Sequence, residues 1–280
     1  MKLPSTFVIV CLLLAACAVP RPTVKIALVA PFEGRLRQVG YDAFPALRLA
    51  IRDAIQAGGV GGYNVTFVAY NDNGDAALAE RVAHDVAIDP EVVAVIGNWV
   101  PTTTLAALHV YTEAGLPVLA PGLPADALPQ DALVFRMGPT EKSHKSRVTS
   151  QACGSLSSRD PGSLKALPEA GSGQFSIFNS QFDSCTLDAP PVSEVPNAAD
   201  ALRGFTDITI GTPPAPRSVV AFDATNVVLD AIRMSASSGN VTRAGVADAL
   251  RRVSHRGLLG TIAFDATGVW ADAPLWEYKR

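Results

Sequence analysis

Short apolar runs alternate with amphipathic segments along the first half of the chain. The runs are rich in Val, Ile, Leu and Ala and end at Pro, Gly or polar turns, as buried strands do. The segments between them carry apolar residues every three or four positions, which is the period of one helix face. Because strands that are apolar on both faces lie in parallel sheets covered by helices, this half is expected to be a doubly wound α/β lobe. The expected strands are 24–30, 65–70, 92–96 and 117–120, and the expected helices are 41–56, 78–86 and 105–114.

The regular pattern fails between Thr140 and Pro216, where Ser, Gly and Pro are frequent and only 175–178 is strand-like. Order returns after this interval, with amphipathic segments that again favour helices. The later elements expected are helices over 218–236 and 243–253, the second capped by Thr242, and strands over 260–265 and 275–278.

The first residues have the three parts of a secretory signal peptide: a basic start, a short apolar stretch and small residues before a cleavage site. The stretch is far shorter than the roughly 20 apolar residues that a membrane-spanning helix needs. Its end, Leu14-Ala15-Ala16-Cys17, resembles the lipobox of bacterial lipoproteins, in which the cysteine is acylated and becomes the new N-terminus. We therefore expect a signal peptide over 1–16, lipid on Cys17, a tether over 17–23 and a place on the outer face of the cell membrane or in the periplasm. A plain signal peptide that happens to contain a cysteine is the alternative.

Charge and cysteine usage narrow the choice of partners. The chain has 23 Lys and Arg against 26 Asp and Glu and no clustered basic face, so no nucleic-acid partner is expected. Of the four cysteines, Cys11 leaves with the signal peptide and Cys17 takes the lipid. Cys153 and Cys185 remain, and in an oxidising compartment they are a candidate disulfide.

Enzymatic chemistry has no positive support in the sequence. The four histidines have no metal-ligand spacing, and no nucleophile elbow, phosphate-binding loop or dinucleotide fingerprint is present. The run 71–75 resembles the start of a calcium loop but lacks the glutamate at the twelfth position, so a polar turn is expected there. A binding protein with no cofactor and no metal is the expectation.

Several short motifs, in their order and spacing, carry a resemblance to a known family. The sequence resembles the type I periplasmic binding proteins, in the branched-chain amino-acid group that serves ABC transporters, over about 25–140 and again from about 213 to the end. The motifs are Lys25-Ile-Ala-Leu-Val-Ala-Pro31, Ala57-Gly-Gly-Val-Gly-Gly62, Asp72 after a strand, Gly97 before a Thr-rich helix start, Ala120-Pro121-Gly122, Phe222-Asp223-Ala224 and Gly260-Thr-Ile-Ala-Phe-Asp265.

The resemblance implies two α/β lobes that close on a small ligand by a hinge, with an ABC permease as partner. The first lobe would comprise 24–139, and 217–280 would return to complete the lobes. The interval 140–216 is too short and too rich in turns for a full second lobe, so either that lobe is reduced or a segment has been lost.

The ligand site is expected where parallel strands end and helices begin, because helix starts present free N–H groups and a positive dipole end. Thr102, Thr103 and Thr104 lie at such a start, although a threonine there can equally be a simple helix cap. Other expected ligand contacts are Phe32, Gly122 and Trp99, the last being either a cleft wall or lobe packing.

In the family a serine or threonine of this loop holds the ligand carboxylate, and Pro101 stands at that position here. The threonine that often follows the Ala-Pro motif of the family is matched here by Pro124. Phe182 and Asp183 are possible contacts from the second lobe.

The leading interpretation is a solute-binding lipoprotein that delivers a small polar ligand, an amino acid or a similar molecule, to an ABC importer. The alternative is a ligand-sensing or scaffold lipoprotein with a degenerate cleft. A third class, an envelope hydrolase, lacks any visible catalytic set.

Overall fold

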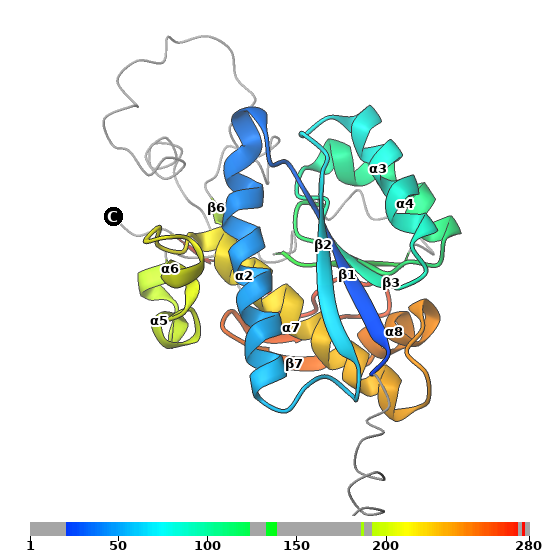
Figure 1. Cartoon of the computed structure of the whole chain (residues 1–280). Helices are drawn as coiled ribbons and strands as arrows, with labels where there is room; N and C mark the ends of the chain where they lie inside the picture. The colour runs from blue at the N-terminus through cyan, green and yellow to red at the C-terminus, as the bar shows by residue number, and fades with distance from the viewer. Residues whose placement is uncertain (1–20, 124–132, 139–185, 188–191, 274–275, 278–280) are drawn as a thin grey trace, which may run out of the picture.

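A five-stranded parallel sheet organises the structure, a computed structural model that describes residues 21–123, 133–138, 186–187, 192–273 and 276–277 (Figure 1). The strands run in the order β2-β1-β3-β4-β5, and each pairs in parallel with its neighbours. Their bounds are β1 Thr23–Ala30, β2 Asn64–Asn71, β3 Val92–Ile96, β4 Val118–Ala120 and β5 Val134–Arg136. The four strands expected in the first half are confirmed, and β5 is an addition to them.

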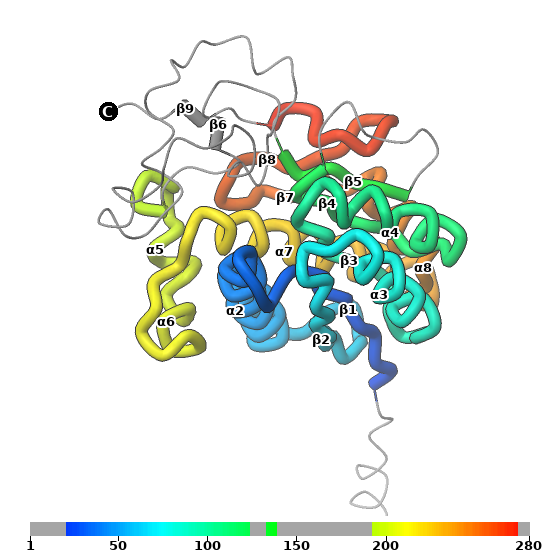
Figure 2. Tube along the Cα trace, turned by 90° about the horizontal axis from the view of Figure 1, so that it is seen from above, coloured from blue at the N-terminus to red at the C-terminus, as the bar shows by residue number. Residues whose placement is uncertain are grey.

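Helices cover both faces of this sheet. Seen from above, α2 and α7 lie on one side of the strands and α3 and α4 on the other (Figure 2). The helices are α2 Arg37–Gln56, α3 Ala76–Ile88, α4 Pro101–Glu113, α7 Pro216–Ser237 and α8 Arg243–Leu250. The expected doubly wound α/β architecture is therefore confirmed.

The two layers of core follow from the alternation of side chains along the strands. On β1, Ile26 and Leu28 face the larger apolar cluster, while Ala27 and Val29 face the smaller one. All four side chains are fully buried, as expected of a central strand with period-two alternation and helices above and below.

The late segment of the chain completes the lobe that the first half begins. Ser218 at the start of α7 donates its hydroxyl hydrogen to the Asp42 carbonyl oxygen of α2 at 2.9 Å. Arg217 lies 3.5 Å from the buried Asp42 carboxylate. After α8, the hairpin of β7 (Ser254–Gly257) and β8 (Gly260–Ala263) follows, and Val269 then pairs with Arg136 beside β5.

Several boundaries differ from those expected, for local reasons. α4 begins at Pro101, four residues before the apolar periodicity, because proline fits the first helical position without loss of a hydrogen bond. α2 likewise begins at Arg37. Thr242 caps α8 as expected, accepting a hydrogen bond from the Gly245 N–H at 3.0 Å.

The described part of the irregular interval contains short elements that the sequence pattern did not indicate. The expected strand 175–178, both disulfide cysteines, Pro124, Phe182 and Asp183 lie outside the described residues. Among the residues described, no helix has the length and apolar character to cross a membrane. The other short elements are η1 Gly34–Leu36, β6 Thr186–Leu187, η6 Val192–Glu194, α5 Ala198–Ala201 and α6 Phe205–Ile208. The strand expected over 275–278 is present as β9 Trp276–Glu277.

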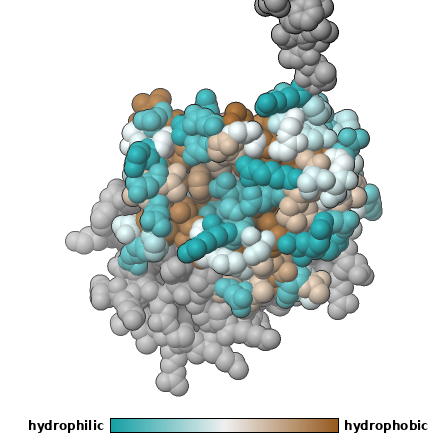
Figure 3. Space-filling view, turned by 90° about the horizontal axis from the view of Figure 1, so that it is seen from below, coloured by the Kyte–Doolittle hydropathy of each residue, from teal (hydrophilic) through white to brown (hydrophobic). Residues whose placement is uncertain are grey.

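The face of the molecule that is seen from below (Figure 3) is mostly polar. Figure 3 shows the molecule from below, with hydrophilic and weakly hydrophobic residues over most of the coloured area and separate small hydrophobic areas between them. The large apolar side chains exposed on the described residues lie on α2, α3 and α4 and after α6: Tyr41, Ile55, Ile88, Leu105 and Ile210.

Candidate functional site

The candidate site lies at the carboxyl edge of the sheet, the upper edge in Figure 1, where the loops after β1, β2, β3 and β4 meet. Two glycines allow the close packing of these loops. Gly97, at φ +137°, has no room for a side chain, since an added Cβ would lie 2.2 Å from the Val29 carbonyl oxygen. A Cβ on Gly122 would lie 2.3 Å from the Trp99 carbonyl oxygen. The loops after β3 and β4 therefore lie in direct contact.

A buried polar pair joins the loops after β2 and β3. The Asn98 side-chain amide donates to the Asp72 carboxylate at 2.8 Å, and the Gly74 N–H donates to the other carboxylate oxygen at 3.0 Å. Both Asp72 and Asn98 are fully buried. Burial raises the pKa of the Asp72 carboxyl, while the hydrogen bonds from Gly74 and Asn98 oppose that rise.

The run 71–75 is a turn followed by a helix cap. The Asn71 side-chain oxygen accepts hydrogen bonds from the Phe32 and Asn73 N–H groups, both at 2.9 Å. Asp75 caps α3 by accepting from the Leu78 N–H at 2.7 Å. Over the described residues, no group of three or more His, Cys, Asp and Glu side chains is arranged to hold a metal ion.

The three threonines of the expected anion site have different surroundings. Thr103 and Thr104 are fully buried, and their hydroxyls donate to the Val100 carbonyl oxygen at 3.0 and 2.9 Å. The Thr104 hydroxyl also lies 2.9 Å from the Asn98 carbonyl oxygen. Thr102 is exposed at the start of α4, so of the three it is the one that presents its side chain to solvent.

The other expected contacts are divided between interior and surface. Trp99 is fully buried within the larger apolar cluster, and its indole N–H has no hydrogen-bond partner among the described residues. The same holds for the side-chain oxygen of Asn98. Phe32 is partly exposed and packs edge-on against Tyr41, with ring centroids 6.3 Å apart, while Gly122 is buried. The structure thus places an unmet donor and an unmet acceptor on adjacent residues at this edge.

Arg136 is a buried cation at the same edge that the sequence reasoning missed. Its guanidinium donates to the Leu123 carbonyl oxygen at 2.7 Å and to the Gly138 carbonyl oxygen at 2.9 Å. The signal was an arginine inside the apolar run 133–137, where a cation is costly unless it is bonded.

Two hollows lined by described residues lie away from this edge. One, of about 440 Å³, lies between α2 and β2. The other, of about 400 Å³, lies at the opposite edge of the sheet, between the end of α3 and the start of α8.

Comparison with known proteins identifies the class to which this fold belongs. Residues 23–159 match the family model described as periplasmic binding protein. The leucine-specific-binding protein of Salmonella typhimurium is 31% identical over 114 residues, which are 41% of this chain and 31% of that protein. The chain therefore matches about a third of the length of this curated relative.

Solved structures share the architecture over most of the chain. A possible leucine/isoleucine/valine-binding protein from Rhodopirellula baltica aligns with a TM-score of 0.68 and 15% identity, covering 93% of this chain and 95% of that one. A branched-chain amino acid transporter substrate binding protein from Streptococcus pneumoniae, solved with isoleucine, aligns with a TM-score of 0.59 and 15% identity, covering 89% and 93%.

The fold is thus that of a type I periplasmic binding protein, as the sequence predicted. Residues 23–159, a little under half of the chain, are similar to the periplasmic binding proteins, and the curated relatives that match this part are leucine-specific and Leu/Ile/Val-type binding proteins. These relatives and solved structures bear the names of amino-acid-binding proteins and of substrate-binding proteins of transporters.

Proposed function

We propose that this protein is an extracytoplasmic lipoprotein that binds a small polar ligand, an amino acid or a similar molecule, and delivers it to an ABC importer. It binds its ligand and does not transform it. The observation that carries the proposal is the match of residues 23–159 to periplasmic binding proteins, because this stretch contains the sheet and the loops after β1 to β4. The relatives bear the names of amino-acid-binding proteins.

The ligand group that suits the candidate site best is a carboxylate. α4 begins at this edge with exposed Thr102, and a helix start favours anions through free N–H groups and its dipole. The Trp99 indole N–H is a further donor, and the Asn98 side-chain oxygen is an acceptor for an ammonium group. A zwitterion would offer a carboxylate to the first of these atoms and an ammonium group to the second.

The membrane end of the molecule is proposed to be opposite the ligand end. The first described residues, Arg21 and Pro22, lie beside Asn64 at the start of β2: the Asn64 side chain donates to the Arg21 carbonyl oxygen at 3.3 Å. An extended chain covers at most about 3.6 Å per residue, so Cys17 lies within about 14 Å of Arg21. Lipid on Cys17 would therefore hold the amino edge of the sheet near the bilayer and leave the carboxyl edge facing away. The domain division expected from the sequence stays part of this proposal.

The second candidate function is a ligand-sensing or scaffold lipoprotein with a degenerate cleft. Three features of the loop after β3 favour it. Pro101 has no N–H to offer an anion, Thr103 and Thr104 use their hydroxyls within the helix start, and Trp99 is packed in the core.

A thermal-shift screen separates the two functions. The mature chain with Cys17→Ser is heated with each common amino acid and with small carboxylates lacking an ammonium group. A ligand at a hundred times its Kd stabilises the folded state by about 2.7 kcal/mol, which raises the Tm of a protein this size by about 5–10 °C. Such a shift with an amino acid supports solute binding, and uptake of that compound by cells with and without the gene then tests delivery. No shift with any compound supports the scaffold function.

A further inference from the structure

The strand β2 forms an open edge of the parallel sheet (Figure 2). Its pairing with β1 is continuous over eight residues without a bulge. The N–H groups of Asn64 and Asp72 donate toward the β1 side of the chain. Because backbone groups alternate in direction along a strand, those of Val65, Phe67 and Ala69 point to the outer side. Among the residues described, no strand pairs with this outer side, so it is a row of backbone donors and acceptors open to another chain.

The edge lacks the features that usually prevent strand addition. Proteins block open edges with charged side chains, proline, bulges or short strands. The stretch 54–71, which includes the end of α2, the connecting loop and the whole of β2, contains no Asp, Glu, Lys, Arg or Pro. A long, regular and uncharged edge strand is a template for pairing.

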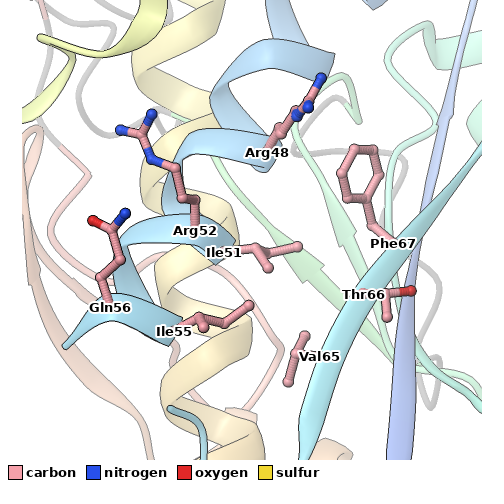
Figure 4. A pocket seen from close by; sticks show the side chains of 8 residues that line it. All are labelled: Arg48, Ile51, Arg52, Ile55, Gln56, Val65, Thr66 and Phe67. Atoms are coloured by element: carbon pink, nitrogen blue, oxygen red, sulfur yellow. The ribbon is translucent and has the colours of Figure 1, made fainter. Parts of the chain in front are cut away.

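An apolar hollow adjoins this edge on its α2 side. Figure 4 shows Ile51 and Ile55 of α2 directed toward Val65 of β2, with Phe67 above them. The hollow measures about 440 Å³, and Ile55 is 52% exposed within it. Alternate residues of a strand added to β2 would point toward this side of the sheet, so the hollow can receive one or two apolar side chains.

The charges around the hollow select the kind of partner. The charged residues that line it are Arg48 and Arg52. Arg52 pairs with its neighbour Asp53 at 3.0 Å, whereas Arg48 has no carboxylate partner among the described residues. A second copy of the chain, paired through the same edge, would bring an uncharged strand and a second pair of arginines. It would therefore add positive charge and supply no carboxylate to Arg48. An extended segment with carboxylates complements the edge, the hollow and the cations together.

We propose that the outer edge of β2 and the hollow between α2 and β2 bind an extended segment of a partner protein. The segment adds to the sheet as a strand, inserts apolar side chains beside Ile55 and presents a carboxylate to Arg48. This interaction surface is separate from the carboxyl edge, so it can be occupied whether or not a solute is bound there.

A pair of synthetic peptides tests the proposal with the mature Cys17→Ser chain. The probes are acetyl-Glu-Thr-Leu-Thr-Val-Thr-Glu-amide, whose glutamates and apolar side chains share one face of a strand, and the same peptide with lysine in place of glutamate, each labelled for fluorescence anisotropy. We expect saturable binding of the acidic peptide, with a Kd below about 1 mM and at least tenfold below that of the lysine peptide. Hydrogen exchange should show added protection at the Phe67 and Ala69 amides.

Three variants assign the binding to this surface. Arg48→Glu with Arg52→Glu should reverse the preference between the two peptides. Ala69→Pro removes an outward N–H without loss of a bond to β1 and should weaken both peptides at least tenfold. Arg81→Glu, an exposed change on α3, is the matched control and should leave both affinities unchanged. Should Ala69→Pro fail to fold, the charge reversal alone decides.

Three results would overturn the proposal: no saturable binding up to about 1 mM, equal affinity for the two peptides, or a preference that survives charge reversal. Sedimentation of the free protein adds a fourth. A dimer that Ala69→Pro dissolves would mean that a second copy occupies the edge.

Discussion

Arg243 binds several chain segments together at the amino edge of the sheet. Its replacement should be among the most destabilising single changes on the described surface. Its guanidinium donates to four backbone carbonyl oxygens, at distances from 2.7 to 3.1 Å. These carbonyls belong to Ala87, Asp89, Val92 and Ala114, so one side chain joins the ends of α3 and α4 to the start of β3. The carbonyls at a helix end have no partner within the helix, and a cation there also complements the helix dipole.

The magnitude follows from these bonds. Hydrogen bonds to a charged group contribute about 1.5–3 kcal/mol each, so four at the lower end amount to about 6 kcal/mol. Water can hydrate the freed carbonyls in part, and the folded state no longer has to desolvate a guanidinium. The net loss of stability is therefore smaller than this sum. We expect Arg243→Met, which keeps the apolar stem, to lower the free energy of unfolding by about 3 kcal/mol and the Tm by about 6–12 °C. Arg243→Lys replaces the planar guanidinium by a compact ammonium group and should lower the free energy of unfolding by about 2 kcal/mol.

Urea unfolding of the Cys17→Ser chain, followed by far-ultraviolet circular dichroism, measures both variants. The matched control is Arg251→Met on the same helix, whose exposed pair with Asp248 at 2.9 Å should contribute less than about 1 kcal/mol. If Arg243→Met lowers the free energy of unfolding no more than Arg251→Met does, the four hydrogen bonds of Arg243 do not stabilise the fold.

Three further predictions concern the anchor, the crosslink and the ligand. Cys17→Ser should move the protein from the membrane to the soluble fraction; retention with lipid label still attached contradicts this. A Cys153–Cys185 disulfide closes a 33-residue loop, which the chain-entropy model values at about 3–4 kcal/mol. Thiol labelling of denatured, unreduced protein should then find neither cysteine free. Thr102→Val should weaken a carboxylate ligand about tenfold by calorimetry and leave the Tm unchanged. Thr103→Val should instead lower the Tm, because that hydroxyl is buried and bonded; equal effects of the two changes would refute the distinction.

The sequence predicted the strands and helices with strong apolar periodicity and missed those without it. β5 is three residues long and contains buried Arg136, so its pattern did not resemble a strand. α5 and α6, at four residues each, are too short for a helical period to be visible. The start of α4 was placed late because Pro101 and the threonines after it carry no apolar repeat, although they suit a first helical turn.

The position of the candidate site was predictable, but the contacts within it were not. Topology alone brings the loops after parallel strands to one edge. The bond between Asp72 and Asn98 joins residues 26 positions apart, and no local spacing rule relates them. The inward turn of the Thr103 and Thr104 hydroxyls depends on burial, which a run of three threonines does not indicate by itself.

The packing of α7 against α2 has a consequence for the order in which this chain can fold. Ser218 bonds Asp42 across 176 positions of sequence, and α7 supplies much of the larger apolar cluster over β1 and β3. On this face α2 covers β1 and β2 and α7 covers β3, so the part of the face over β3 stays uncovered until residues up to Ser237 have left the ribosome. The stretch 23–159, which carries the family match, would by itself leave the apolar surface over β3 exposed to water. A newly made chain therefore exposes this apolar surface until α7 is made, which leaves the lobe incomplete during any export that begins before translation ends.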